Sequence, residues 1–197
     1  VLLMIKAEFF VQLIGAAFFL ILNIYLAKQG FSDPEIANFI SYRFLAVMLL
    51  AFPLGFYIKG KPLKPFFILG SLGVPTVAIA LVLAIQYGLY HYLPTLFILW
   101  GVVFTLFQVS SLPYVMRNTL VANQSHAISL NYATHSFGTI LSGIMIFGFG
   151  QFMREMDEGV ILLFIATLGF FGVYYLLKMK VDVVVPVNKG LQWKSYD

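Results

Sequence analysis

The chain contains no cysteine, and only 10% of its 197 residues are charged. Without cysteine, disulfides and thiolate metal sites are excluded. A soluble domain carries about 25% charged residues, so this shortage is typical of a surface that mostly faces lipid. The net charge of +4 does not indicate a nucleic-acid partner, because the positive residues stand at the ends of apolar stretches, where they set membrane topology. We expect no nucleic acid, no metal and no cofactor.

The sequence also lacks the usual signatures of catalysis. It contains no paired carboxylates, no HExxH and no glycine-rich phosphate loop. A membrane-embedded enzyme, with His135 as base and Arg43 holding an oxyanion or phosphate, is the weakest alternative, because these two residues stand toward opposite faces of the bilayer. We therefore predict no catalytic residues and no enzyme activity.

What the sequence has in abundance is apolar residues, which make up 61% of the chain. A helix needs about 20 of them to cross about 30 Å of hydrocarbon, and backbone groups inside lipid must bond within the protein. The sequence predicts an all-α membrane protein, with a six-helix transmembrane bundle over residues 1–180 and a cytoplasmic tail or interdomain linker over 181–197. The expected spans cover about residues 8–28, 36–58, 66–87, 94–116, 127–152 and 159–178.

The positive residues predict the orientation of the spans. The side with few of them has only Lys28 and Arg154. We expect a multi-pass protein of a bacterial inner membrane with both ends of this segment cytoplasmic. The cytoplasmic side then collects Lys6, Lys59, Lys61, Lys64, Arg117, Lys178 and Lys180.

The lengths of spans and loops recur at an offset of about 90 residues, so that Tyr42 aligns with Tyr132. Spans one to three then correspond to spans four to six. Because three is odd, the second trio enters the membrane from the opposite side. This predicts two inverted three-helix repeats, a plan shared by many secondary transporters.

The arginine, the histidine and the candidate amide side chains inside the spans are confined to spans one, two, four and five. Spans three and six have no ionisable side chain except tyrosine, so we expect them outside and able to face lipid all round. The simplest geometry is a polar cavity between the other four spans. Its candidate substrate-binding residues are Gln12, Asn23, Arg43, Gln108, Asn131 and His135.

Each of these residues also has a structural interpretation. Arg43 can snorkel to the outer interface, and His135 or the amides can simply join helices by hydrogen bonds. The spacing of Asn131, His135, Gly138 and Ser142 places them on one helical face. No Asp or Glu lies deep in a span, and Glu8 is at the cytoplasmic edge. If a proton is coupled to transport, then His135, Glu8 or an absent half must carry it.

The chain resembles half of a major facilitator superfamily transporter. Residues 55–64, GFYIKGKPLK, form the end of span two and the cytoplasmic loop after it, where the family carries a loop signature. Gly55 and Lys64 match the first glycine and last base of that signature, whereas Lys59 stands in place of its acid. The resemblance covers all six spans, implies an amino-terminal bundle followed by a linker, and makes Gly55, Lys59, Lys61 and Lys64 candidates for a conformational loop.

The resemblance implies a secondary active transporter, or its amino-terminal half, that moves a small polar or anionic solute by alternating access. Its partners would be the lipid bilayer, the solute and a second six-helix bundle, either in the same longer chain or in a second copy. Arg43 would attract an anionic or polar group, and Asn23, Gln108 and His135 would hydrogen-bond the solute. A non-transporting membrane subunit or scaffold is the main alternative.

Overall fold

The computed structural model describes residues 1–152 and 157–181, and within these ranges every regular element is helical. Six helical segments are long and apolar enough to span a membrane, by length and composition. The prediction of an all-α membrane protein with six spans is thus confirmed. The spans are α1 (Leu2–Lys28), α2 (Asp33–Tyr57), α3 (Lys64–Gln86), α4 (Leu93–Arg117), α5 (Gln124–Phe152) and, together, α6 (Glu158–Leu168) with α7 (Phe170–Leu177).

Two short 3-10 turns, η1 (Tyr90–Tyr92) and η2 (Val121–Asn123), precede α4 and α5. The predicted tail beyond Val181 lies outside the described residues, as does Arg154.

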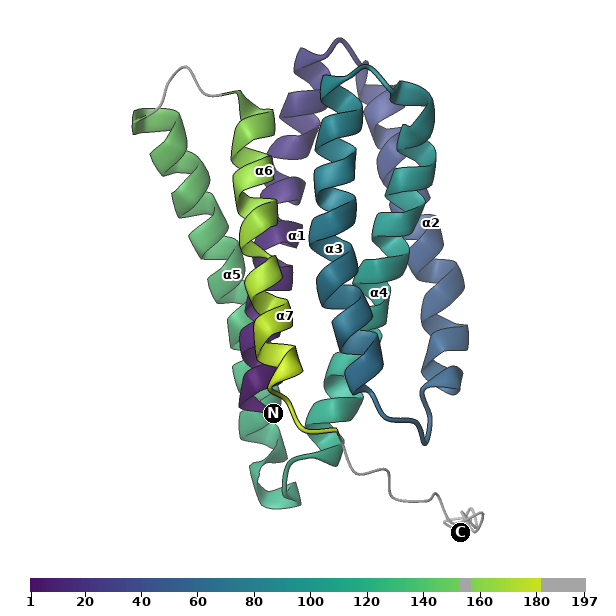
Figure 1. Ribbon diagram of the computed structural model, residues 1–197, viewed down its shortest axis with the longest axis vertical. Coiled ribbons are helices and arrows are strands. Elements are labelled where there is room, and N and C mark those ends of the chain that lie inside the picture. The colour runs from purple at the N-terminus through teal and green to yellow at the C-terminus, as the bar shows by residue number, and fades with distance from the viewer. Residues whose placement is uncertain (153–156, 182–197) are drawn as a thin grey trace, which may run out of the picture.

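Successive spans run in opposite directions, so the connections alternate between the two ends of the bundle (Figure 1). The N-terminus, the α2–α3 and α4–α5 connections and the end of α7 share one end. We call this the basic end, because it holds Lys59, Lys61, Lys64, Arg117 and Lys178. At the opposite end, Lys28 of α1 forms an ion pair with Glu158 of α6.

Glycine ends two of the helices. Gly30 follows α1 with φ +92° and Gly88 follows α3 with φ +69°, a conformation that other residues rarely adopt. Each turns the chain so that the next amide, from Phe31 or Leu89, donates back to the carbonyl five residues earlier. The last carbonyls of both helices are thereby satisfied before the chain re-enters the membrane.

The helices differ strongly in how much of their surface the bundle covers. In the most apolar window, 61% of α1 and 50% of α3 is buried, against 11% of α2 and of α5. The two exposed helices flank the bundle (Figure 1), where α2 packs chiefly on α4 and α5 chiefly on α1. The expectation that spans three and six can face lipid all round is wrong, because α3 packs against α1, α4, α6 and α7.

The physical reason is that a lipid tail is as apolar as a leucine side chain. A span without polar groups can therefore pack on lipid or on other helices, and composition does not distinguish the two.

Candidate functional site

A fully buried carboxylate lies at the centre of the polar contacts of the bundle. Glu8 of α1 has 0% of its surface exposed. The hydroxyl of Ser111 on α4 donates to Glu8 Oε2 over 2.9 Å. The amide nitrogen of Asn131 on α5 in turn donates to Ser111 Oγ over 3.1 Å. Three helices therefore meet around one carboxylate.

His135 completes this network, which we call the Glu8 cluster: Glu8, Gln12, Ser111, Asn131 and His135. Nε2 of His135 lies 2.6 Å from Glu8 Oε1 and 3.5 Å from the amide nitrogen of Gln12. The His135 side chain keeps 28% of its surface exposed, whereas that of Glu8 has none. One member of the pair is thus sealed in the bundle and the other is reachable from outside it.

The sequence of α5 explains how this helix reaches α1. Asn131, His135, Gly138 and Ser142 follow at intervals of four, three and four residues and share one face. A Cβ on Gly138 would lie 3.3 Å from the Cβ of Gln12, closer than ordinary van der Waals contact, so glycine eases the close approach of the two helices. Ser142 then donates to the carbonyl of Leu13 over 2.8 Å. The face predicted from the spacing is the one that α5 presents to α1 and α4.

A second polar site, which we call the Arg43 cage, lies between α1, α2 and α4. The guanidinium carbon of Arg43 lies 4.3 Å from the ring centre of Trp100, 5.0 Å from that of Phe104 and 5.7 Å from that of Phe44. A cavity of about 30 Å³ beside it is lined by Arg43 and Trp100 and by Asn23 of α1. The aromatic faces attract the cation through their quadrupoles.

The Arg43 cage contains hydrogen-bond donors that have no acceptor. Nε of Arg43 and Nε1 of Trp100 are both buried without a hydrogen-bond partner within the described residues. In the same part of the chain, no acidic side chain forms an ion pair with Arg43. Unmatched donors beside a positive charge are groups that can pair with an anion. The cavity in this arrangement, at about 30 Å³, has room for about one water molecule.

Phe104 of α4 contacts both α1 and the Arg43 cage. Its ring edge would lie 3.0 Å from a Cβ on Gly15, one turn beyond Gln12 on the same helix. Its other neighbour is the guanidinium of Arg43. An aromatic ring therefore stands between the two polar sites along the bundle.

A scan against family models, curated proteins and solved structures finds no match for this chain. The geometry of its own residues is therefore what bears on function. Among the described residues no group of three His, Asp or Glu side chains is placed to hold a metal ion.

The structure divides the residues singled out from the sequence between the two sites. Gln12, Asn131 and His135 belong to the Glu8 cluster, whereas Asn23 and Arg43 line the cavity of the Arg43 cage. Gln108 is half-buried on α4 and belongs to neither.

Glu8 and Ser111 are the members that the sequence did not place among the candidate substrate-binding residues, although Glu8 was a candidate proton carrier. The signal for Glu8 was its spacing, since it stands four residues before Gln12 on one face of the same helix. Its place near the end of an apolar stretch suggested a carboxylate at the membrane edge instead.

The loop predicted to be conformational is tied to two other helices. Arg117, at the end of α4, donates to the carbonyls of Lys61 over 2.9 Å and Ile58 over 3.3 Å. Lys64 donates to the carbonyls of Leu177 and Met179 after α7. Gly55 lies inside α2, and Lys59 is exposed in the loop. Cations thus lie at the carbonyl ends of α2 and α7, where the helix dipole is negative.

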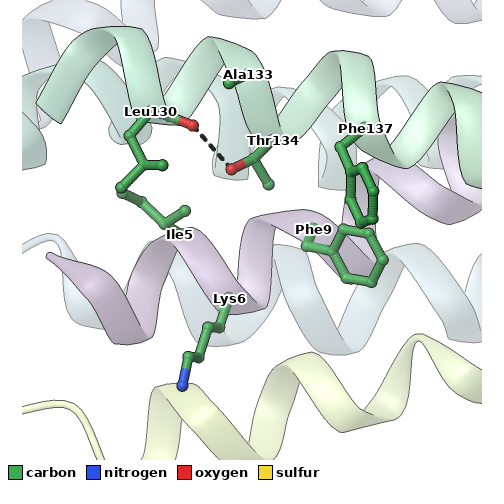
Figure 2. A pocket seen from close by; sticks show the side chains of 7 residues that line it. All are labelled: Ile5, Lys6, Phe9, Leu130, Ala133, Thr134 and Phe137. Atoms are coloured by element: carbon green, nitrogen blue, oxygen red, sulfur yellow. Dashed lines mark hydrogen bonds between the residues drawn. The ribbon is translucent and has the colours of Figure 1, made fainter. Parts of the chain in front are cut away.

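The cavity that lies beside the Glu8 cluster, between α1 and α5, is apolar. A groove of about 470 Å³ lies between α1 and α5, with Ile5, Phe9, Leu130 and Phe137 along it (Figure 2). The hydroxyl of Thr134 donates to its own helix at the Leu130 carbonyl. Figure 2 shows the amine of Lys6 pointing away from this groove, toward the far side of α1. The groove therefore offers no polar group to a solute and is suited to lipid.

Proposed function

We propose that this chain is a secondary active transporter, or the amino-terminal half of one, that moves a small polar or anionic solute by alternating access. The observation that carries the proposal is the Glu8 cluster. A charged side chain inside the hydrocarbon is costly, and the cost is greatest at the bilayer centre, where it is about 2.5–3.5 kcal/mol on insertion scales. Ionisable residues kept inside spans at such a cost typically mark solute or ion pathways.

The packing of the helices supports the plan of two three-helix repeats. α2 of the first trio packs chiefly on α4 of the second, and α5 of the second packs chiefly on α1 of the first. Likewise, α3 of the first trio packs on α4, and α6 with α7 of the second trio packs on α1. A two-fold axis that exchanges the trios would produce this reciprocal pattern, which is the arrangement of repeats in many transporters, the major facilitator superfamily included.

The exposed helices support a partner bundle. α2 and α5 are buried over only 11% of their apolar windows. Gly143, Gly148 and Gly150 of α5 have no atom within 4 Å of a Cβ built on them. Small residues allow helices to approach closely in a membrane. A second six-helix bundle, in the same longer chain or a second copy, would cover these faces and complete the pathway.

The Arg43 cage supports an anionic solute, and the distribution of charge supports the orientation. The unmatched donors of Arg43 and Trp100 would pair with a carboxylate or phosphate group. The basic end collects the positive residues, so it would face the cytoplasm. A bacterial inner membrane is the location that we propose on this basis.

The experiment is uptake by proteoliposomes that contain the protein expressed from its complete gene. The probes are radiolabelled monocarboxylates, inorganic phosphate and neutral sugars, tested for both uptake and counterflow. Arg43→Gln should lower the uptake of the transported anion by about 10–100-fold, because a hydrogen bond to a charged group contributes about 1.5–3 kcal/mol.

Lys28→Gln is the matched control, since Lys28 is an exposed cation at the same end of the bundle. It should leave uptake within about twofold of that of the unmodified protein. The absence of both uptake and counterflow for every probe, in protein with native helix content, would refute the proposal in favour of a non-transporting subunit.

A further inference from the structure

We infer that Glu8 and His135 form a proton-binding site that couples solute movement to a proton gradient. This inference rests on the proposed transport function and assigns its coupling ion. Two observations carry it: the contact distance between the pair and the unequal exposure of its members.

The contact distance requires a proton between the two residues. Glu8 Oε1 and His135 Nε2 lie 2.6 Å apart, and two lone pairs at that distance would repel each other. Either Nε2–H donates to a carboxylate or a neutral carboxyl donates to Nε2. Nδ1 of His135 makes no hydrogen bond within the described part of the chain. It is the atom left to take up or release a second proton.

The exchange of this second proton changes the charge of the site. With Nδ1 unprotonated, a carboxylate and a neutral imidazole carry a net charge of −1. When Nδ1 takes a proton from water, the pair becomes a carboxylate and an imidazolium with a net charge of zero. Burial of an uncompensated charge is costly, whereas a hydrogen-bonded pair of opposite charges is tolerated. The proton-loaded form therefore favours the closed arrangement in which Glu8 is sealed.

Proton release would favour the opposite change. The remaining carboxylate gains from hydration, which requires α5 to separate from α1. α5 is suited to such a movement, since only 11% of its apolar window is buried. Its bonds to α1 are concentrated in a short stretch from His135 to Ser142. Gain and loss of one proton would thus bias the α1–α5 contact between two states.

Proton exchange takes place at the exposed part of His135. The imidazole side chain keeps 28% of its surface exposed, whereas the Glu8 side chain has none. A proton that enters or leaves the pair therefore passes through the imidazole. The cavity of about 580 Å³ at the basic end is lined by Ile5 and Leu130 as well as by Asn118, Asn123 and His126, and it stops short of the pair.

Other titratable or charged groups on the surrounding elements make contacts of their own. Tyr132 of α5 lies beside His135, with ring centres 5.8 Å apart. Lys6 of α1 extends to the Tyr175 ring of α7. On α4, Tyr114 packs on the ring of Phe67, and Arg117 donates to the α2–α3 loop. At the end of α7, Lys64 of α3 donates to the Met179 carbonyl, and Lys178 donates to the Tyr174 hydroxyl. Farther from the pair, Arg43 of α2 contacts Trp100, and Glu158 of α6 contacts Lys28.

The first test detects the proton directly. Nitrogen-15 histidine NMR of the protein in nanodiscs, recorded across a pH series, follows each imidazole, and the His135 signal is assigned by its loss in His135→Gln. In Glu8→Gln, the ring-nitrogen signals of His135 should change, because the charged acceptor beside Nε2 is removed. The signals of His91, which is exposed at the opposite end, should stay the same. His135 signals unchanged by Glu8→Gln throughout the series would overturn the inference.

The unmodified protein decides the question if Glu8→Gln does not fold. The Nε2 proton of His135 should be hydrogen-bonded and protected from exchange with water. A freely exchanging Nε2 proton would overturn the inference.

The second test separates coupling from transport. With a solute found in the uptake panel, Glu8→Gln should keep counterflow but lose accumulation driven by a pH gradient, so that the internal concentration falls to that outside. Glu158→Gln, which removes the carboxylate paired with Lys28, is the control and should accumulate normally.

Accumulation by Glu8→Gln equal to that of the unmodified protein would overturn the inference while leaving transport intact. Failure of the proposed function looks different, because counterflow is then absent from the unmodified protein as well.

Discussion

Replacement of Gly101 by alanine should push α2 away from α4 and disturb the Arg43 cage. A Cβ at this position would lie 2.4 Å from the carbonyl oxygen of Arg43 and 2.8 Å from the Cβ of Ala46. Ordinary contact begins at 3.4 Å, so α2 must retreat by about 1 Å. The obstacle is backbone, which cannot rotate aside as a side chain can.

The expected cost follows from two opposing effects. Overpacking of a close contact typically destabilises by about 1–3 kcal/mol, whereas alanine gains about 1 kcal/mol over glycine in a helix. Gly143→Ala isolates the second effect, because Gly143 is helical and has nothing within 4 Å of its Cβ position. Gly101→Ala should therefore be less stable than Gly143→Ala by about 1–3 kcal/mol.

The assay is unfolding by SDS titration in mixed micelles, followed by circular dichroism. The fluorescence of Trp100, isolated by Trp193→Phe, should also change in Gly101→Ala, because the guanidinium of Arg43 lies over its ring. Equal or greater stability of Gly101→Ala, with unchanged Trp100 fluorescence, would refute the deduction that α2 and α4 meet at this glycine.

Two further predictions concern contacts between helices. Ser142→Ala should lower the free energy of unfolding by about 0.6–1.7 kcal/mol, because it removes the buried hydrogen bond to the Leu13 carbonyl. The control is Thr139→Ala, which removes a hydrogen bond within α5; equal losses of stability in the two variants would contradict the reasoning. Arg117→Gln should release two loop carbonyls and speed tryptic cleavage after Lys59 by about tenfold; an unchanged cleavage rate would show that Arg117 does not hold the loop.

Local patterns predicted much of the Glu8 cluster. The intervals that join Asn131, His135, Gly138 and Ser142 define one helical face, and that face meets α1 and α4. Such a prediction needs only the periodicity of a single helix. The burial of Glu8 was missed because it depends on where α4 and α5 cross α1, and that crossing is set by contacts between distant residues.

The Arg43 cage illustrates the same division. An arginine inside an apolar span is visible in the sequence and predicts a partner of some kind. The identity of that partner was not predictable, since Trp100 and Phe104 lie on a helix more than fifty residues away. The separation of Asn23 and Arg43 from His135 into two sites, with Phe104 between them, likewise required the packed bundle.

The sequence by itself determined that the chain is suited to a membrane, that it has six spans and that successive spans alternate in direction. Each of these follows from the length and composition of one segment at a time. Only the tertiary structure decided that α3 packs within the bundle, that α2 and α5 lie exposed at its flanks, and that a carboxylate near the start of α1 is sealed beside an imidazole. Apolar helices pack on lipid or on one another with similar ease, so the choice is made by the fit of particular small and polar side chains where helices cross.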